Sequence, residues 1–121
     1  YEDLNKKIDA PIVFYTAGGD VLPFADIFHK TKTIGVFPSA DDDLAEFKKI
    51  SGGKYTLFGN LNNLELGDWP IDFMEKAIKK TINIGKPNGK FVLATQHMIP
   101  HGVSIEKIAE LINIALKYAY Y

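Results

Sequence analysis

The sequence predicts an α/β fold in which four consecutive strand–helix (βα) units share one parallel sheet. Short apolar runs typical of buried strands centre near residues 13, 35, 57 and 92, and a segment of helical periodicity follows each run. Every run also ends in small or polar residues, as strands do where they enter a βα loop. Four such units form either a small open doubly wound sheet or half of an eight-unit barrel.

The first two units are indicated by apolar runs and by capping residues. Residues 11–15 form a continuous apolar run, and Asp20 beyond them can cap a helix. Residues 33–37 predict the second strand. Ser39 or Asp41 can cap the helix that follows, where several acidic residues complement the positive end of the helix dipole.

The last two units contain the longest helices. Residues 55–58 predict a third strand and residues 90–95 a fourth, with a helix over residues 70–84 between them. Ser104 can cap the final helix. The predicted buried stripe of that helix consists of Ile105, Ile108, Ile112, Ala115, Leu116 and Ala119.

The composition argues against several classes of protein. Fourteen lysines oppose fifteen acidic residues, arginine is absent, and a net charge of −1 gives no basic patch for nucleic acid. Cysteine is also absent, which excludes disulfides and Cys-ligated zinc within this chain. No apolar run approaches the roughly 18 residues of a membrane span. We therefore expect no nucleic-acid or membrane partner, and a cytoplasmic location.

His97 is the candidate catalytic residue, because it directly follows the fourth strand. A histidine there can act as an acid or base, ligate a metal or donate a hydrogen bond. Parallel strands bring their carboxyl ends to one edge of the sheet, where such folds bind ligands. Turn and cap formation is the competing explanation for the polar residues at that edge. The candidate substrate-binding residues there are Gly18, Asp20, Gly59, Asn60 and Gln96.

Most of the chain resembles the C-terminal half of the uroporphyrinogen decarboxylase superfamily. The stretches that carry the resemblance are residues 11–20, 44–53, 57–61, 91–99 and 103–108. The resemblance implies that residues 1–121 are a single-domain fragment, the C-terminal half of a (βα)8 (TIM) barrel. It also implies an enzyme as the full-length parent, with this fragment inactive alone. The other half of the barrel, or a second copy of the chain, would then be its partner.

The superfamily includes the tetrapyrrole decarboxylase and the corrinoid-linked methyltransferases. The methyltransferase branch has a His-x-Cys zinc motif and a later Cys, and the matching positions here are Tyr15, Ala17 and His97. These zinc ligands are therefore not matched, and the cofactor stays open between zinc and a corrinoid on a partner protein. The leading hypothesis is the corrinoid methyl-transfer branch. The alternatives are a genuine uroporphyrinogen decarboxylase and a small non-enzymatic α/β binding module.

A half barrel has consequences for its surface. Its helices should all cover one face of the sheet, leaving the other face open. We expect the inward faces of Val13, Val36, Leu57 and Val92, or of their neighbours, to be unburied. The hydrophobic effect should then favour self-association of the isolated chain.

Overall fold

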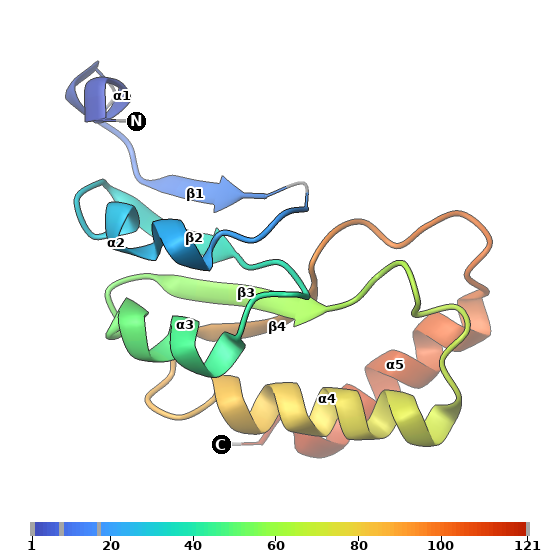
Figure 1. Ribbon diagram of the computed structural model, residues 1–121. Coiled ribbons are helices and arrows are strands. Elements are labelled where there is room, and N and C mark those ends of the chain that lie inside the picture. The colour runs from blue at the N-terminus through green and yellow to red at the C-terminus, as the bar shows by residue number, and fades with distance from the viewer. Residues whose placement is uncertain (1, 8, 17, 121) are drawn as a thin grey trace.

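The computed structural model describes residues 2–7, 9–16 and 18–120, and Figure 1 shows how its elements follow one another. One parallel sheet has the strand order β1-β2-β3-β4, so neighbours in the sheet are also neighbours in the chain. The predicted parallel fold of four βα units is confirmed. The strands are β1 (Ile12–Tyr15), β2 (Thr33–Phe37), β3 (Thr56–Leu61) and β4 (Phe91–Thr95).

The helices follow the strands in the predicted alternation. A short helix α1 (Glu2–Lys7) comes before β1, and each strand is then followed by helical structure (Figure 1). The connecting elements are η1 (Leu22–Phe24), α2 (Ala25–Phe28), α3 (Leu44–Ser51), α4 (Ile71–Gly85) and α5 (Ile105–Tyr118).

Two predictions about element ends need correction. The third strand does not stop before Gly59 but continues through Gly59 and Asn60 to Leu61. The N-cap of α3 is Asp43, whose side chain accepts hydrogen bonds from two backbone N–H groups of the first turn. Neither Ser39 nor Asp41 has this role. Ser104 does cap α5, through a bond from the backbone N–H of Lys107.

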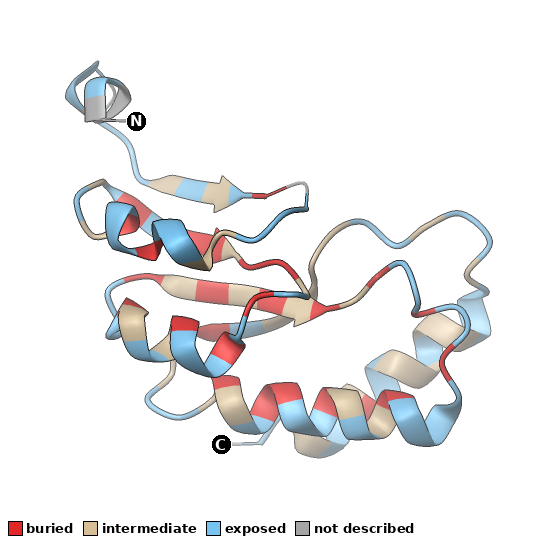
Figure 2. Cartoon of the chain, viewed as in Figure 1, coloured by how far each residue is buried: buried red, intermediate tan, exposed pale blue. Residues whose placement is uncertain are grey.

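The helices that follow the strands pack on one face of the sheet. Figure 2 shows β3 alternating between buried and half-buried residues. Val36 and Leu57 point to the helices and are completely buried, so at these two positions it is the neighbours, Phe37 and Phe58, that lie on the opposite face and are only half-buried. Val13 and Val92 lie on the opposite face and are 49% and 45% exposed. We call this opposite side of the sheet the open face.

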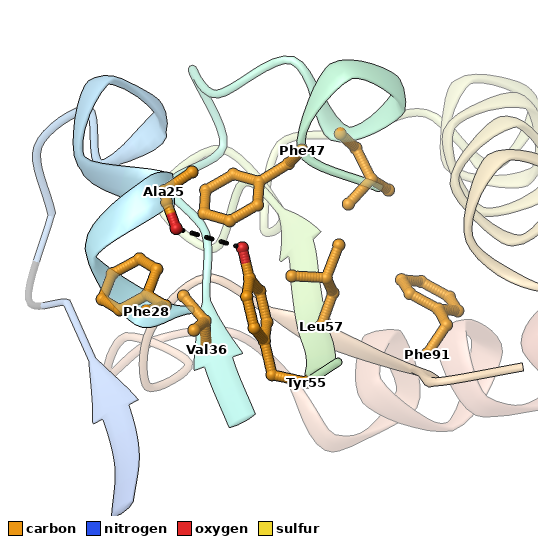
Figure 3. Close-up of a cluster of buried hydrophobic side chains, with 8 residues drawn as sticks. Ala25, Phe28, Val36, Phe47, Tyr55, Leu57 and Phe91 are labelled. Carbon is orange, nitrogen blue, oxygen red and sulfur yellow. Dashed lines mark hydrogen bonds between the residues drawn. The ribbon is translucent and has the colours of Figure 1, made fainter. Parts of the chain in front are cut away.

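The first core cluster lies between the sheet and helices α2 and α3. Figure 3 shows Tyr55 at its centre, surrounded by Phe28, Phe47 and Leu57. The Tyr55 hydroxyl donates a hydrogen bond of 3.5 Å to the carbonyl oxygen of Ala25. Burial, with a smaller contribution from the nearby Asp26 carboxylate, raises the pKa of Tyr55 to about 12. This phenol therefore stays neutral and belongs to the core.

The second core cluster joins α4 and α5 to the carboxyl half of β3. Met74 and Ile78 of α4 are completely buried, while Ile114 is the buried residue of α5. The stripe predicted for α5 is largely wrong, because Ile105, Ile112 and Leu116 are between 50% and 77% exposed. An apolar groove of about 390 Å³ separates this side of α5 from β4.

Two glycines allow aromatic rings to approach the backbone closely. A Cβ on Gly85, in the last turn of α4, would lie 2.4 Å from the ring of Phe91 at the start of β4. A Cβ on Gly35 of β2 would lie 2.7 Å from the ring of Phe58 on the open face. Both distances are shorter than any van der Waals contact, so each ring occupies space that only glycine leaves.

The contact between Gly85 and Phe91 predicts the effect of a single added methyl group. Gly85→Ala should lower the free energy of unfolding by about 1–3 kcal/mol, because the buried Phe91 ring cannot move without disturbing the core. Urea denaturation measures this change. Asn83→Ala, at an exposed position of the same helix, is the control and should have little effect. Equal stability of the Gly85 variant and the parent would contradict the packing described.

Candidate functional site

Tyr15 and His97 meet across the whole width of the sheet. Tyr15 is the last residue of β1 and His97 lies just beyond β4, so they belong to the two edge strands. Their ring centroids are nevertheless only 5.4 Å apart, at an interplanar angle of 42°. Three strand spacings in a flat sheet would span about 14 Å. The two side chains therefore reach toward each other from opposite edges of the sheet, and both rings lie on its open face.

The same open face carries a row of aromatic rings. Tyr15 contacts Phe37 edge-on at 5.0 Å between centroids, and Phe37 stacks on Phe58 at 4.8 Å. No residue of the four strands is charged. The centre of the open face is consequently aromatic and neutral, with the His97 imidazole at its carboxyl end.

His97 itself is held by its backbone. The Thr95 hydroxyl donates a 2.7 Å hydrogen bond to the His97 carbonyl oxygen. Within the described part of the chain, neither imidazole nitrogen makes a hydrogen bond. The ring is half-buried, so both nitrogens are available to a bound molecule.

Asp42 organises the loops beside this pair. Its carboxylate accepts hydrogen bonds from the backbone N–H groups of Ser39, Val21 and Leu22, at 2.7, 3.1 and 2.9 Å. The β1–η1 loop and the β2–α3 loop are thereby tied to one buried side chain. The sequence analysis missed Asp42, because it is the middle residue of three consecutive aspartates and only its position in the fold distinguishes it.

Asp42 also has the most perturbed carboxyl group of the site. Burial is the main cause, and a hydrogen bond with the Asp20 side chain adds to it; together they raise the pKa of Asp42 from 3.8 to about 6. The backbone N–H groups of Leu22, Ser39 and Val21 act in the opposite direction. The Asp42 carboxyl group therefore holds a proton under mildly acidic conditions.

Gln96 and Asn60 brace the β2–α3 loop from the sheet. The Gln96 side-chain oxygen accepts a 2.6 Å hydrogen bond from the Ala40 backbone N–H and a longer one from the Ser39 hydroxyl. The Asn60 amide donates to the carbonyl oxygens of Ser39 and Asp42, at 2.8 and 3.1 Å. In this structure both side chains therefore position a loop. Their predicted contact with a substrate stays a prediction.

The remaining candidate residues differ in exposure: Gly18 and Asp20 are exposed, whereas Gly59 is buried. Gly18 and Gly19 have positive φ angles of 106° and 89° in an exposed loop, a conformation that favours glycine. Asp20 is exposed, and its side chain accepts a 3.1 Å bond from the Leu22 N–H. Gly59 is buried and faces Pro38, so the structure does not bring it to the open face.

The positions that match a zinc motif do not form a metal site. Tyr15 stands where the resemblance implies histidine, and His97 stands where it implies cysteine. Ala17, the third matching position, lies outside the described residues and has no ligating atom in its side chain. Among the residues that the structure describes, no three His, Cys, Asp or Glu side chains are grouped to hold a metal ion. The residues present therefore do not fit zinc.

Comparisons with known proteins agree with this architecture. The family model described as uroporphyrinogen decarboxylase (URO-D) matches residues 1–118. The chain belongs to the uroporphyrinogen decarboxylase family. A comparison with curated protein sequences gave no match. In the part of the family fold described here, no helix is both long and apolar enough to cross a membrane.

A solved structure shows the same fold in a longer chain. The chain superimposes on a methyltransferase from Methanosarcina mazei with a TM-score of 0.78 and 16% sequence identity. The match covers 98% of this chain but only 34% of the methyltransferase. This URO-D chain thus spans about one third of that structure and corresponds to part of a barrel.

The Asp42 pKa predicts how stability depends on pH. Because the folded-state pKa is raised, the contribution of Asp42 is fully present below pH 3.8 and is lost as pH rises through about 6. The loss should reach about 3 kcal/mol. Asp42→Asn should be less stable in acid, because the NH2 group that replaces Oδ2 cannot accept a hydrogen bond from the Ser39 N–H. It should, however, lack this part of the pH dependence. Urea denaturation between pH 4 and 8 measures both effects.

A matched control is Ser39→Ala, which removes a buried side chain but keeps the Ser39 backbone N–H on Asp42. This variant should lose similar stability at every pH and retain the parent's slope. A parent profile that is flat from pH 4 to 7, or a slope that survives in Asp42→Asn, would refute the assignment.

The Gln96 brace predicts a local effect on the β2–α3 loop. Gln96→Leu should accelerate hydrogen exchange at the Ala40 amide by roughly fivefold, which corresponds to the loss of a hydrogen bond worth about 1 kcal/mol. Gln96→Glu keeps an acceptor oxygen and should exchange close to the parent rate. Amide exchange followed by mass spectrometry distinguishes the two, and equal protection in Gln96→Leu and the parent would argue against the brace.

Proposed function

We propose that this chain is the C-terminal half of a (βα)8-barrel enzyme, with its active centre on the open face beside His97. The observation that supports it most directly is the meeting of Tyr15 and His97 across the edge strands. In a closed barrel these positions lie at the carboxyl ends of the strands, where barrel enzymes hold their catalytic residues. His97 would act there as an acid or base, since both of its nitrogens are available.

The proposal requires a partner that closes the barrel. β1 and β4 have unpaired edges, and the groove between α5 and β4 is lined by apolar residues. Ile112 and Leu116 border that groove and are at least half exposed. The first half of the same barrel, or a second copy of this chain, would bury them. Open edges and exposed apolar faces favour such pairing.

For the reaction, we favour methyl transfer to or from a corrinoid on a partner protein. The neutral aromatic open face suits a methyl group or an apolar cofactor edge better than a polycarboxylate. The solved structure with the same fold is named as a methyltransferase, which supports this branch by analogy of fold. Thiolate zinc is not part of the proposal, because the ligand positions do not fit.

Uroporphyrinogen decarboxylation is the second candidate, and the family match favours it. A substrate with many carboxylates must be bound by cationic side chains, and arginine is the residue best suited to bind carboxylates. This chain has no arginine, so the other half of the barrel would have to supply such residues. Gly18, Asp20 and Gln96 would lie at the rim of the substrate site in either reaction.

An activity comparison tests the two reactions. The whole protein would be incubated with a methylated corrinoid protein and a thiol acceptor, and separately with uroporphyrinogen. The expected result is demethylation of the corrinoid, which is detected as a change in its absorption spectrum. Release of carbon dioxide from uroporphyrinogen, without corrinoid demethylation, would favour the decarboxylase.

The role of His97 predicts a loss of activity without a loss of folding. His97→Ala should reduce turnover of the whole enzyme by roughly 10²-fold or more, which is the usual contribution of an acid or base. The thermal midpoint should change little, because the ring is half-buried and not hydrogen-bonded. His101→Ala, at an exposed position in the following turn, is the control. Parent-like turnover in His97→Ala would remove this residue from the mechanism.

A further inference from the structure

Tyr15 stands out among the residues of the open face that have no assigned role. Its side chain is 47% exposed, so it contributes little burial to the core of this half. It nevertheless touches two other rings, Phe37 on the neighbouring strand and His97 at the far edge of the sheet. A residue that only filled space would not need this placement.

The ring contacts form a chain from the backbone of β2 to the imidazole. Phe58 occupies the space above Gly35 and stacks against Phe37 at an interplanar angle of 14°. Phe37 meets the edge of Tyr15 at 78°, and Tyr15 meets His97 at 42°. Aromatic pairs have preferred orientations, so each contact restricts the rings that it joins. The orientation of the imidazole is thereby coupled to a fixed part of the sheet.

We infer that Tyr15 is the positioning residue for His97, holding the imidazole at the carboxyl end of the open face, at the place where the resemblance implies a zinc centre. Thr95 fixes the His97 backbone, and Tyr15 fixes the ring. The two together replace what metal coordination does elsewhere for a histidine, which is to set the direction of its nitrogens. The proposed function is needed only for the catalytic use of His97, not for this contact.

The chemistry of the available donors supports the inference independently. A zinc site requires four ligands in tetrahedral arrangement, and three protein ligands at the minimum. Tyr15 offers one hydroxyl oxygen and His97 offers its imidazole nitrogens, and the two rings contact each other at a tilt of 42°. No cysteine exists in the chain to complete the set. An aromatic contact is the interaction that these two side chains can make.

A spectroscopic experiment tests the positioning role without knowledge of the substrate. The whole protein would be labelled at its histidine ring carbons, and the His97 signal assigned by its loss in His97→Gln. Tyr15→Phe keeps the ring and should leave the His97 signal in place. Tyr15→Leu removes the ring current and should move the signal to the position of exposed His101. A second variant, Tyr15→Met, should give the same shift with an unbranched side chain.

The chain contains its own reference for this measurement. His29 meets the ring of Tyr55 at 5.4 Å and 49°, almost the geometry of the Tyr15–His97 pair. Its signal should stay unchanged in every Tyr15 variant and so reports that the fold is intact. A His97 signal that is the same in the parent, Tyr15→Leu and Tyr15→Met would overturn the inference. So would a shift in Tyr15→Phe as large as in Tyr15→Leu.

Zinc binding provides a second and separate test. In equilibrium dialysis of the whole protein against zinc alone, the amount of bound zinc should be the same in the parent and in His97→Gln. Stoichiometric zinc in the parent that disappears in His97→Gln would overturn the inference. Neither test depends on the reaction, so failure of the proposed function would leave both results interpretable.

Discussion

The handedness of the βα connections is the constraint on which this structure depends. Parallel strands joined through helices cross over in the right-handed sense in nearly all cases. When four strands also follow one another in spatial order, every crossover falls on the same face. One face of the sheet is then covered by α2 to α5 and the other is left open, and all strand carboxyl ends share one edge. The site and the unpaired strand edges both follow from this arrangement.

Polar residues at the carboxyl edge divide into two kinds. The first kind forms hydrogen bonds with loop backbone and so gives the β1–η1 and β2–α3 loops a defined shape; these residues are Asp42, Gln96 and Asn60. Tyr15 and His97 make no such bonds in the described chain and project from the open face. The first group builds a frame, and the second group is left available for chemistry. This division explains why the edge is rich in polar residues although few of them face a ligand.

The sequence predicted the order and type of the elements because each apolar run and each glycine or capping residue acts locally. It predicted the edge at which His97, Gln96 and Asn60 gather for the same reason. The inward stripe of α5 was not predictable, because helical periodicity identifies an apolar face but not the element that covers it. Leu116 is apolar, yet among the described residues nothing covers it and it is more than half exposed. The roles of Asp42 and Tyr15 depend on contacts with residues 20 to 82 positions away, which no local pattern encodes.

The close approach of Phe58 to Gly35 has a consequence for how such a sequence can diverge. A side chain at position 35 is compatible with the fold only if position 58 becomes smaller at the same time, since the two share one volume on the open face. Because Phe58 in turn stacks on Phe37, a third position is drawn into the same exchange. In a homologous alignment these positions should therefore vary together, as a unit whose summed size is held constant while its individual members change.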